Sequence, residues 1–256
     1  MDQNFSSLLV LAIDAAEKAC IEILEVYNSG DFQEEAKGDN SPLTRADKKA
    51  HEIISKTLAP SKLPVLSEEG STIPYAERRD WDYFWMVDPL DGTKEFIKRN
   101  DEFTVNIALI HKGRPVMGVV AVPVGGDVYY ATAGAGAFLK RKGVTEKLAM
   151  RMPIDQSSPG LRVVASRSHM NKSTENFINN LDGAVLVSAG SSLKFMLLAS
   201  GQADIYPRFG PTMEWDTAAA QIVVEEVGMK VMKSGGKAGA VEYNKEDLLN
   251  PDFLVG

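Results

Sequence analysis

Cysteine and histidine, the residues that form cross-links and bind soft metals, are scarce in this sequence. The 256 residues include three histidines and a single cysteine, Cys20. A lone cysteine excludes an internal disulfide and any metal site built from several thiolates, and it fits a reducing compartment. We assign no role to His51 or His111, and we expect no metal ligation by imidazole.

Long hydrophobic runs and an excess of basic residues are also absent. The longest apolar runs, such as Val116–Val124, have about half of the ~18 residues that a membrane-spanning helix needs. The first residues, Met1–Ser7, lack the basic start and apolar stretch of a signal peptide, so we expect a cytoplasmic protein. The formal net charge of −7 argues against non-specific nucleic-acid binding. It does not argue against an anionic substrate, because bound metal ions reverse the local charge.

The composition is otherwise that of a globular protein, with 44% hydrophobic and 25% charged residues. A chain of this length forms one large domain or two small ones. Proline, serine and glycine cluster near residues 145–160, and the pattern of elements changes there. We therefore expect an N-terminal unit over residues 1–150 and a C-terminal unit over residues 151–256.

The N-terminal unit begins with two predicted helices. Apolar residues at helical spacing predict a long helix from Phe5 to Tyr27, closed by Gly30. A polar loop over 31–42 separates it from a second helix over 44–58, for which the threonine at its start is the expected N-cap.

Strands follow the helices. We expect short strands at 64–66 and 85–87, and then a run of four strands at 103–110, 115–122, 128–132 and 137–139. Because no helix separates the four, they should be antiparallel. In the C-terminal unit, strands at 161–165, 184–187 and 203–206 alternate with helices near 171–181, 191–200 and 217–227, which is typical of an α/β unit.

Acidic residues lie at three points where predicted elements begin or end. They are Glu68-Glu69 after the first short strand, Asp88-Pro89-Leu90-Asp91-Gly92-Thr93 after the second, and Asp216 within Trp215–Ala219. We expect Pro89 to stop the strand and to hold Asp88 extended, because a residue before proline avoids helical geometry. Gly92 allows the backbone to approach a ligand closely. The N–H groups that follow Asp91 and Asp216 lie at starts of elements, where anions are favoured.

Each acidic point has an ordinary structural explanation. Asp-Pro and Asp-Gly are common turn dipeptides, Asp216 is a common kind of N-cap, and Glu68-Glu69 fits a solvated loop. If the carboxylates meet, they raise one another's pKa and are most stable around divalent cations. Carboxylates without histidine or cysteine select hard ions such as Mg²⁺ or Mn²⁺. The pattern of residues alone leaves open whether they meet.

The two aspartate motifs, in this order and with Glu68-Glu69 upstream, resemble the inositol-monophosphatase-like family of Mg²⁺-dependent, lithium-sensitive phosphatases. The resemblance spans nearly the whole chain. Within the family, three segments are similar to the 3'(2'),5'-bisphosphate nucleotidase (CysQ-type) branch: Ala165–His169, Gly190–Phe195 and Tyr206–Asp216. The resemblance implies an α/β fold, a layered αβαβα sandwich with a mostly antiparallel N-terminal sheet, a smaller C-terminal α/β half and the active site between them.

The resemblance also implies a set of metal ligands. Glu68, Asp88 and the backbone carbonyl of Leu90 would bind one Mg²⁺. Asp88, Asp91 and Asp216 would bind a second, with Asp88 bridging the two ions. A third, weaker ion near Glu68 is known in the family, and Mn²⁺ is a second candidate metal.

Asp47 and Thr93 would orient and deprotonate the attacking water. The structural alternative for Asp47 is a first-turn carboxylate that the helix dipole stabilises. We expect direct attack of water activated by metal, without a phospho-enzyme intermediate. The lack of a nucleophile motif agrees with this, since Cys20 lies on an apolar helix face.

The branch implies a bisphosphorylated nucleotide as substrate, with 3'-phosphoadenosine 5'-phosphate giving AMP and phosphate, and with a sulfated analogue as a related substrate. Gly190 and Lys194 would hold the nucleotide and its 5'-phosphate, with Ser166 and His169 near the sugar or base. We add Arg208 as a phosphate ligand because its geometry suits bidentate contact. The residues next to the metals would complete the substrate site: Glu68, Leu90, Asp91, Gly92, Thr93 and Asp216.

Other interpretations compete with this one. Lys194 could be a solvated lysine and His169 a polar residue at a helix start. An inositol or small sugar phosphatase is the alternative within the class, and a catalytically silent nucleotide sensor is one outside it. Dinucleotide binding at Gly134-x-Gly136 fails because Leu139 stands where the third glycine belongs. We expect no protein partner, and peripheral attachment to the inner membrane stays open because some relatives show it.

Overall fold

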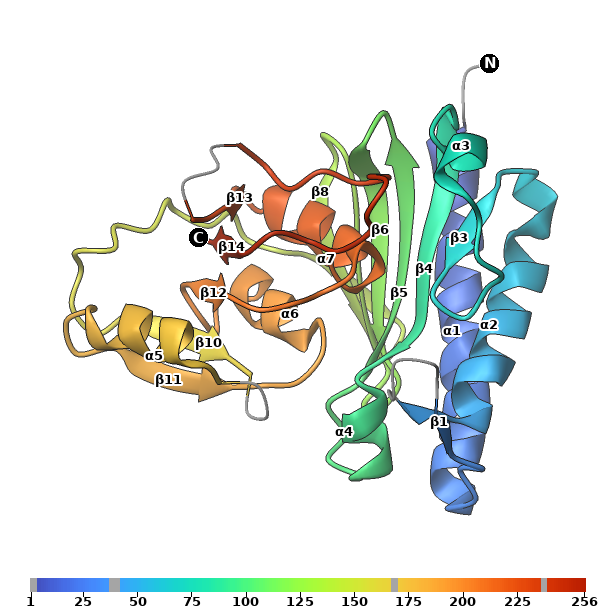
Figure 1. The fold of residues 1–256 in the computed structure, drawn as a ribbon, viewed down its shortest axis with the longest axis horizontal. Helices are drawn as coiled ribbons and strands as arrows, with labels where there is room; N and C mark the ends of the chain where they lie inside the picture. Colours follow the sequence, from blue (N-terminus) through green and yellow to red (C-terminus); the bar gives the residue numbers. More distant parts are fainter. Residues whose placement is uncertain (1–3, 37–41, 167–169, 236–238) are drawn as a thin grey trace.

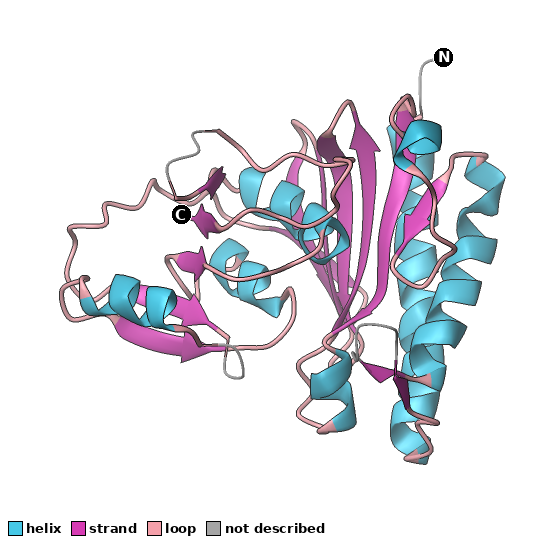
Figure 2. Cartoon of the chain, viewed as in Figure 1, coloured by secondary structure: helices cyan, strands magenta, loops and turns pink. Residues whose placement is uncertain are grey.

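The computed structural model describes residues 4–36, 42–166, 170–235 and 239–256. Its elements form successive layers: a helix pair, a large sheet, a second helix pair, small sheets and an outer helix (Figures 1 and 2). This is the predicted αβαβα order. Among the described residues, no helix is both long enough and apolar enough to cross a membrane.

The outer helix pair is α1 (Phe5–Ser29) and α2 (Arg45–Leu58), and both were predicted. α1 ends at Gly30, whose φ of 72° is in the left-handed region that favours glycine. α2 begins after Thr44, the predicted N-cap. The two helices bury small and branched side chains against one face of the large sheet. Two-residue strands β1 (Glu35–Ala36) and β2 (Pro42–Leu43) pair between them.

The large sheet has seven strands in chain order. They are β3 (Val65–Ser67), β4 (Tyr83–Asp91), β5 (Thr104–His111), β6 (Arg114–Val122), β7 (Asp127–Thr132), β8 (Gly136–Arg141) and β9 (Val144–Lys147). β3 and β4 are parallel, and the other neighbours pair antiparallel, as the predicted run of strands requires. β9 was not predicted, because all of its residues are exposed and it has no apolar alternation. Short helices η1 (Ala59–Ser61), α3 (Tyr75–Arg78) and α4 (Thr93–Ile97) lie in the connections.

The expectation that Pro89 stops its strand is wrong. β4 continues through Pro89 to Asp91, and its register with β5 shifts between the pairs Asp88–Asn106 and Asp91–Thr104. The irregularity accommodates a residue that cannot donate to the ladder. Both aspartates therefore stay on one strand.

The inner helix pair is α6 (Leu193–Ala199) and α7 (Glu214–Glu225). Behind it lie the parallel pair β10 (Arg162–Ala165) and β11 (Val185–Ser188), and the antiparallel sheet β12 (Tyr206–Arg208), β14 (Phe253–Val255) and β13 (Val231–Lys233). α5 (Lys172–Asn179) is the outer helix. β12 begins later than predicted. β13 and β14, each of three residues, were not predicted.

α7 belongs to the C-terminal part of the chain but packs on the large sheet. A Cβ added to Gly118 of β6 would lie 2.3 Å from the carbonyl oxygen of Ala219, so the helix backbone rests directly on this strand. Ala218 and Ile222 share one hydrophobic cluster with Val120 of the sheet. This contact fixes the start of α7 relative to the end of β4, where the predicted site residues lie.

Candidate active site

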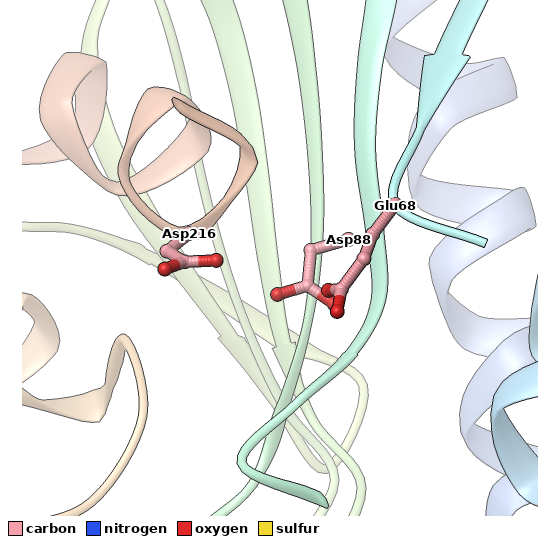
Figure 3. A group of neighbouring side chains, drawn as sticks. All are labelled: Glu68, Asp88 and Asp216. Atoms are coloured by element: carbon pink, nitrogen blue, oxygen red, sulfur yellow. The ribbon is translucent and has the colours of Figure 1, made fainter. Parts of the chain in front are cut away.

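Three carboxylates from distant parts of the sequence meet at the edge between the large sheet and α7 (Figure 3). Glu68 follows β3, Asp88 lies on β4, and Asp216 lies in the first turn of α7. One oxygen from each lies within 4.8 Å of the others. The convergence that the sequence pattern left open is therefore present for these three residues, and Asp91 lies near enough for its charge to act on Asp88 and Asp216.

Asp216 occupies a different helix position from the one expected. Met213 is the N-cap of α7, and the Asp216 carboxylate accepts a hydrogen bond from the Met213 N–H at 2.9 Å. Asp216 is thus inside the first turn, and its assignment as N-cap is wrong. The bond orients one carboxylate oxygen toward the helix start.

The cluster is electrostatically strained without a cation. Burial raises the pKa of Asp88 well above its ordinary value, and the charges of Glu68, Asp91 and Asp216 raise it further. Burial is also the largest cause of the raised pKa of Asp216, followed by Asp91 and Glu68. Crowded carboxylates that supply only oxygen are the donor set that Mg²⁺ binds, and its charge would offset their repulsion. The residues present therefore fit a magnesium site.

Hydrogen bonds connect Asp91 to the C-terminal part of the chain. Its Oδ2 accepts hydrogen bonds from the Ser191 hydroxyl and the Ser192 N–H, both at 2.6 Å. Leu90, next to it, donates its N–H to Asp88 Oδ1 at 3.1 Å. The backbone of β4 and the loop before α6 thus hold the two aspartates in place.

Asp47 and Thr93 are brought together, although they come from different helices. Asp47 is 1% exposed, and its Oδ2 accepts hydrogen bonds from the N–H and hydroxyl of Thr44 at 2.7 and 2.6 Å. Thr93 donates its hydroxyl to Asp47 Oδ1 at 3.2 Å and also lies 3.3 Å from the carbonyl oxygen of Leu90. Asp47 therefore serves the helix start with one oxygen and faces Thr93 with the other.

A cavity of about 120 Å³ adjoins the carboxylates, with Asp91 and Asp216 on its wall. Lys194 lines it and is only 6% exposed, so the solvated-lysine interpretation is wrong. Burial lowers the pKa of Lys194 to about 8, and its Nζ donates to the carbonyl oxygen of Ser191 at 2.6 Å. A buried cation beside an acidic cluster suits an anionic ligand that bridges the two.

Arg208 lies between this cavity and a second one of about 370 Å³, and Ser166 and Tyr206 line both. Its Nη2 donates to the carbonyl oxygen of Pro211 at 2.7 Å. Its buried Nε has no hydrogen-bond partner among the residues that the structure describes. Arg208 lines both cavities, and a guanidinium has the planar geometry that suits bidentate contact with a phosphate. His169, and Lys37 and Asp39 of the polar loop, lie outside the described residues.

The two predicted binding glycines pack too closely for a side chain. Gly92 has φ of 93°, and a Cβ there would lie 3.0 Å from the carbonyl oxygen of Glu102. A Cβ on Gly190 would lie 2.9 Å from that same oxygen and 2.9 Å from Cγ of Glu95. Both positions therefore need glycine to bring the loop before α6 against the end of β4.

Several residues of the cavity wall were missed from the sequence. They include Glu95, Ser191, Ser192, Tyr206 and Thr212. Burial raises the pKa of Glu95, while the nearby Lys194 lowers it. Ser191 has φ of 52°, an uncommon conformation for a residue with a side chain. The Gly-Ser-Ser sequence before α6 was the available signal, but only its glycine was selected.

Similarity to known proteins identifies the family. The profile of the Inositol monophosphatase family matches residues 4–256. A relative from Salmonella typhimurium, named 3'(2'),5'-bisphosphate nucleotidase CysQ, is 46% identical over 91% of this chain and 93% of its own. The protein of the same name from Escherichia coli strain K12 is 45% identical over the same shares. The crystal structure of CysQ from Bacteroides thetaiotaomicron has a TM-score of 0.86 and 48% identity over 98% of this chain and 97% of that one. This chain therefore belongs to the inositol monophosphatase family.

Proposed function

We propose that this protein is a Mg²⁺-dependent 3'(2'),5'-bisphosphate nucleotidase that converts 3'-phosphoadenosine 5'-phosphate to AMP and phosphate. Relatives named for this activity are 45–46% identical over 91% of the chain. The observation that carries the proposal is the placement of the acidic cluster beside a cavity with two cationic side chains, Lys194 and Arg208. This arrangement matches a substrate with two separate phosphates.

The proposed metal ligands are the carboxylates of the cluster and one backbone carbonyl. Glu68, Asp88 and Leu90 O would hold one Mg²⁺, and Asp88, Asp91 and Asp216 a second. A third ion beside Glu68, and Mn²⁺ in place of Mg²⁺, belong to the same proposal. When bound, the ions offset the charge of the phosphate dianion, lower the pKa of a water ligand and stabilise the leaving alkoxide.

Asp47 and Thr93 supply the proposed acid–base chemistry. The Thr93 hydroxyl donates to Asp47 Oδ1, so its oxygen lone pairs can accept a hydrogen bond from the attacking water. Asp47 takes the proton from water through Thr93. Because the other Asp47 oxygen is held by Thr44, the base has a fixed orientation.

The remaining predicted residues form the proposed nucleotide site. Lys194 and Arg208 bind the 5'-phosphate, and the backbone at Gly92 and Gly190 approaches the substrate closely. Ser166 lines both cavities, which suits its proposed place near the sugar or base. His169 keeps its predicted role near the sugar or base. A cytoplasmic location, with or without peripheral attachment to the inner membrane, stays a prediction.

The test is phosphate release from matched substrates in saturating Mg²⁺. We expect 3'-phosphoadenosine 5'-phosphate to be cleaved with a much higher kcat/KM than inositol 1-phosphate. A strong preference for the inositol ester would replace this proposal with an inositol monophosphatase. No turnover of any phosphomonoester would leave only a nucleotide-binding role.

A further inference from the structure

Behind Asp91, a row of hydroxyl and amide groups runs between the large sheet and the loop before α6. Ser191 Oγ lies 2.6 Å from Asp91 Oδ2, and Thr104 Oγ1 lies 2.6 Å from Ser191 Oγ. Thr104 Oγ1 is also 2.7 Å from Ser192 Oγ, which is 2.8 Å from the side-chain amide of Asn106. Thr104, Ser192 and Asn106 are at most 2% exposed, so each contact needs a proton from within the row.

Counting the available protons determines which group donates in each hydrogen bond of this row. Its four contacts need four protons, but its three hydroxyls supply one each, and a carboxylate only accepts. Within the part of the chain that the structure describes, the remaining donor of the row is Asn106 Nδ2, and we assign the fourth proton to it. The two ends of an amide have the same shape, so its orientation follows from the hydrogen bonds that it makes.

A second observation supports the same orientation. In the structure the amide oxygen of Asn106 faces Ser192 Oγ, and Nδ2 is buried with no hydrogen-bond partner in the described part of the chain. Turning the amide gives Nδ2 a partner and leaves a carbonyl oxygen without a donor. Unpaired buried carbonyl oxygens are less rare than unpaired buried N–H groups.

We infer that Asn106, Ser192, Thr104 and Ser191 form a one-way chain of hydrogen-bond donors that ends on Asp91, and that Asn106 and Thr104 are positioning residues for this aspartate. Each donates to the next: Asn106 Nδ2 to Ser192 Oγ, Ser192 Oγ to Thr104 Oγ1, Thr104 Oγ1 to Ser191 Oγ, and Ser191 Oγ to Asp91 Oδ2. The inference rests on the proposed function in one respect, that Asp91 binds Mg²⁺.

The register of the sheet explains why these two residues can act on the site. Thr104 lies opposite Asp91 and Asn106 lies opposite Asp88 on the neighbouring strand. Ser191 and Ser192 enter from the C-terminal part of the chain, so the row joins the two sides of the site. With Oδ2 engaged by two donors, Asp91 has Oδ1 left to bind a cation.

The experiment measures Mg²⁺ binding by calorimetry without substrate, using Thr104→Val, which removes the hydroxyl at nearly constant shape, and Thr104→Ser, which keeps it. We expect Thr104→Val to weaken Mg²⁺ binding about tenfold. Thr104→Ser should bind within about twofold of the unsubstituted protein. Circular dichroism checks folding. If Thr104→Val does not fold, Ser191→Ala is the second variant. It removes the hydroxyl between Thr104 and Asp91 and should weaken Mg²⁺ binding by the same tenfold.

A nuclear magnetic resonance measurement on the metal-free protein tests the orientation of Asn106. Its side-chain amide signal, identified by its loss in Asn106→Asp, should exchange slowly with solvent and shift in Thr104→Val. An amide signal that exchanges freely, or Mg²⁺ binding in Thr104→Val equal to that of the unsubstituted protein, overturns the inference. Absence of Mg²⁺ binding in the unsubstituted protein would instead overturn the proposed function, so the two failures are distinct.

Discussion

The large sheet and the C-terminal layers each contribute residues to the candidate site, and different contacts position those residues in the two regions. β4 is buried from Phe84 to Leu90, with hydrophobic clusters on both faces of its sheet. β10 and β11 form a two-stranded sheet whose β11 residues Val185 and Leu186 are 53% and 51% exposed. Polar contacts stabilise that region, among them the paired hydrogen bonds from Arg162 to Asp204.

The difference shows which contacts fix the positions of the site residues in each region. Apolar burial fixes the strand that carries Asp88 and Asp91, and it tolerates changes in pH and salt. On the other side, α6 and β12 are also packed in an apolar cluster, but hydrogen bonds from Lys194 to the Ser191 carbonyl and from Arg208 to the Pro211 carbonyl orient the proposed phosphate-binding groups. Polar contacts of this kind depend on protonation and ionic strength. Substitutions in the two regions should therefore affect different measurable quantities.

The largest expected effect comes from Asp88→Asn on the sheet side. The variant removes a charge shared by both proposed metal sites, so we expect turnover to fall by about 10³-fold or more. The fold should persist, because asparagine has nearly the same shape and the buried charge is costly without metal. Phosphate release and thermal unfolding, measured in parallel, check this. Near-normal rates at saturating Mg²⁺ would contradict the metal assignment.

Gly118→Ala should break the packing between the two regions. The added Cβ would lie 2.3 Å from the Ala219 carbonyl oxygen, which forces α7 away from the sheet. We expect a loss of about 3 kcal/mol in the free energy of unfolding, measured by urea titration. Gly210→Ala is the control, because a Cβ there meets nothing closer than 3.5 Å. Equal stability of the two variants would show that the contact contributes little.

Lys194→Met should sharpen the comparison, because it changes a residue of the C-terminal region and leaves the carboxylates of the large sheet unchanged. It removes the buried cation but keeps the length of the side chain, so binding of the 5'-phosphate should suffer. We expect kcat/KM for 3'-phosphoadenosine 5'-phosphate to fall about 30-fold. Hydrolysis of 3'-AMP, which lacks the second phosphate, should change less than about threefold. Equal losses for both substrates would assign Lys194 to the reacting phosphate instead.

The smallest effect concerns Asp204 and depends on pH. Hydrogen bonds from Arg162 lower the pKa of Asp204 below its ordinary value. A lowered pKa stabilises the fold at pH above the value of the unfolded chain, and this contribution disappears as pH falls through the folded value. Asp204→Asn should therefore lose at most about 1 kcal/mol near pH 7. In chemical denaturation, the difference from the unsubstituted protein should shrink as pH falls below the ordinary pKa of an aspartate and through the lowered pKa of Asp204. A difference that is independent of pH would contradict this origin.

The two regions also differ in how far their structure could be predicted. The strands at 103–139 repeat apolar residues at strand spacing, so their number and antiparallel order followed from local pattern. β13 and β14 have three residues each, too few for any period to show. The extension of β4 through Pro89 depends on its partner strand and could not be predicted from the local sequence.

For the candidate site, the carboxylates could be predicted from the sequence, but the residues that hydrogen-bond to them could not. Glu68, Asp88 and Asp216 were selected because they lie where predicted elements begin or end, and the resemblance to a known family implied that they meet. The contact between Ser191 and Asp91 joins residues 100 positions apart and depends on the left-handed turn at Ser191. No periodicity or spacing in the sequence encodes such a contact, because it arises only when α6 and the large sheet have docked.

The double use of Asp47 would tie the proposed catalysis to the integrity of a helix. One carboxylate oxygen completes the hydrogen bonding at the start of α2, and the other receives the Thr93 hydroxyl. A side chain one methylene longer, or an amide in its place, would have to satisfy both partners at once. If Asp47 acts as proposed, a substitution there would lower both the stability of the start of α2 and the reaction rate, so the two losses could not be separated at this position.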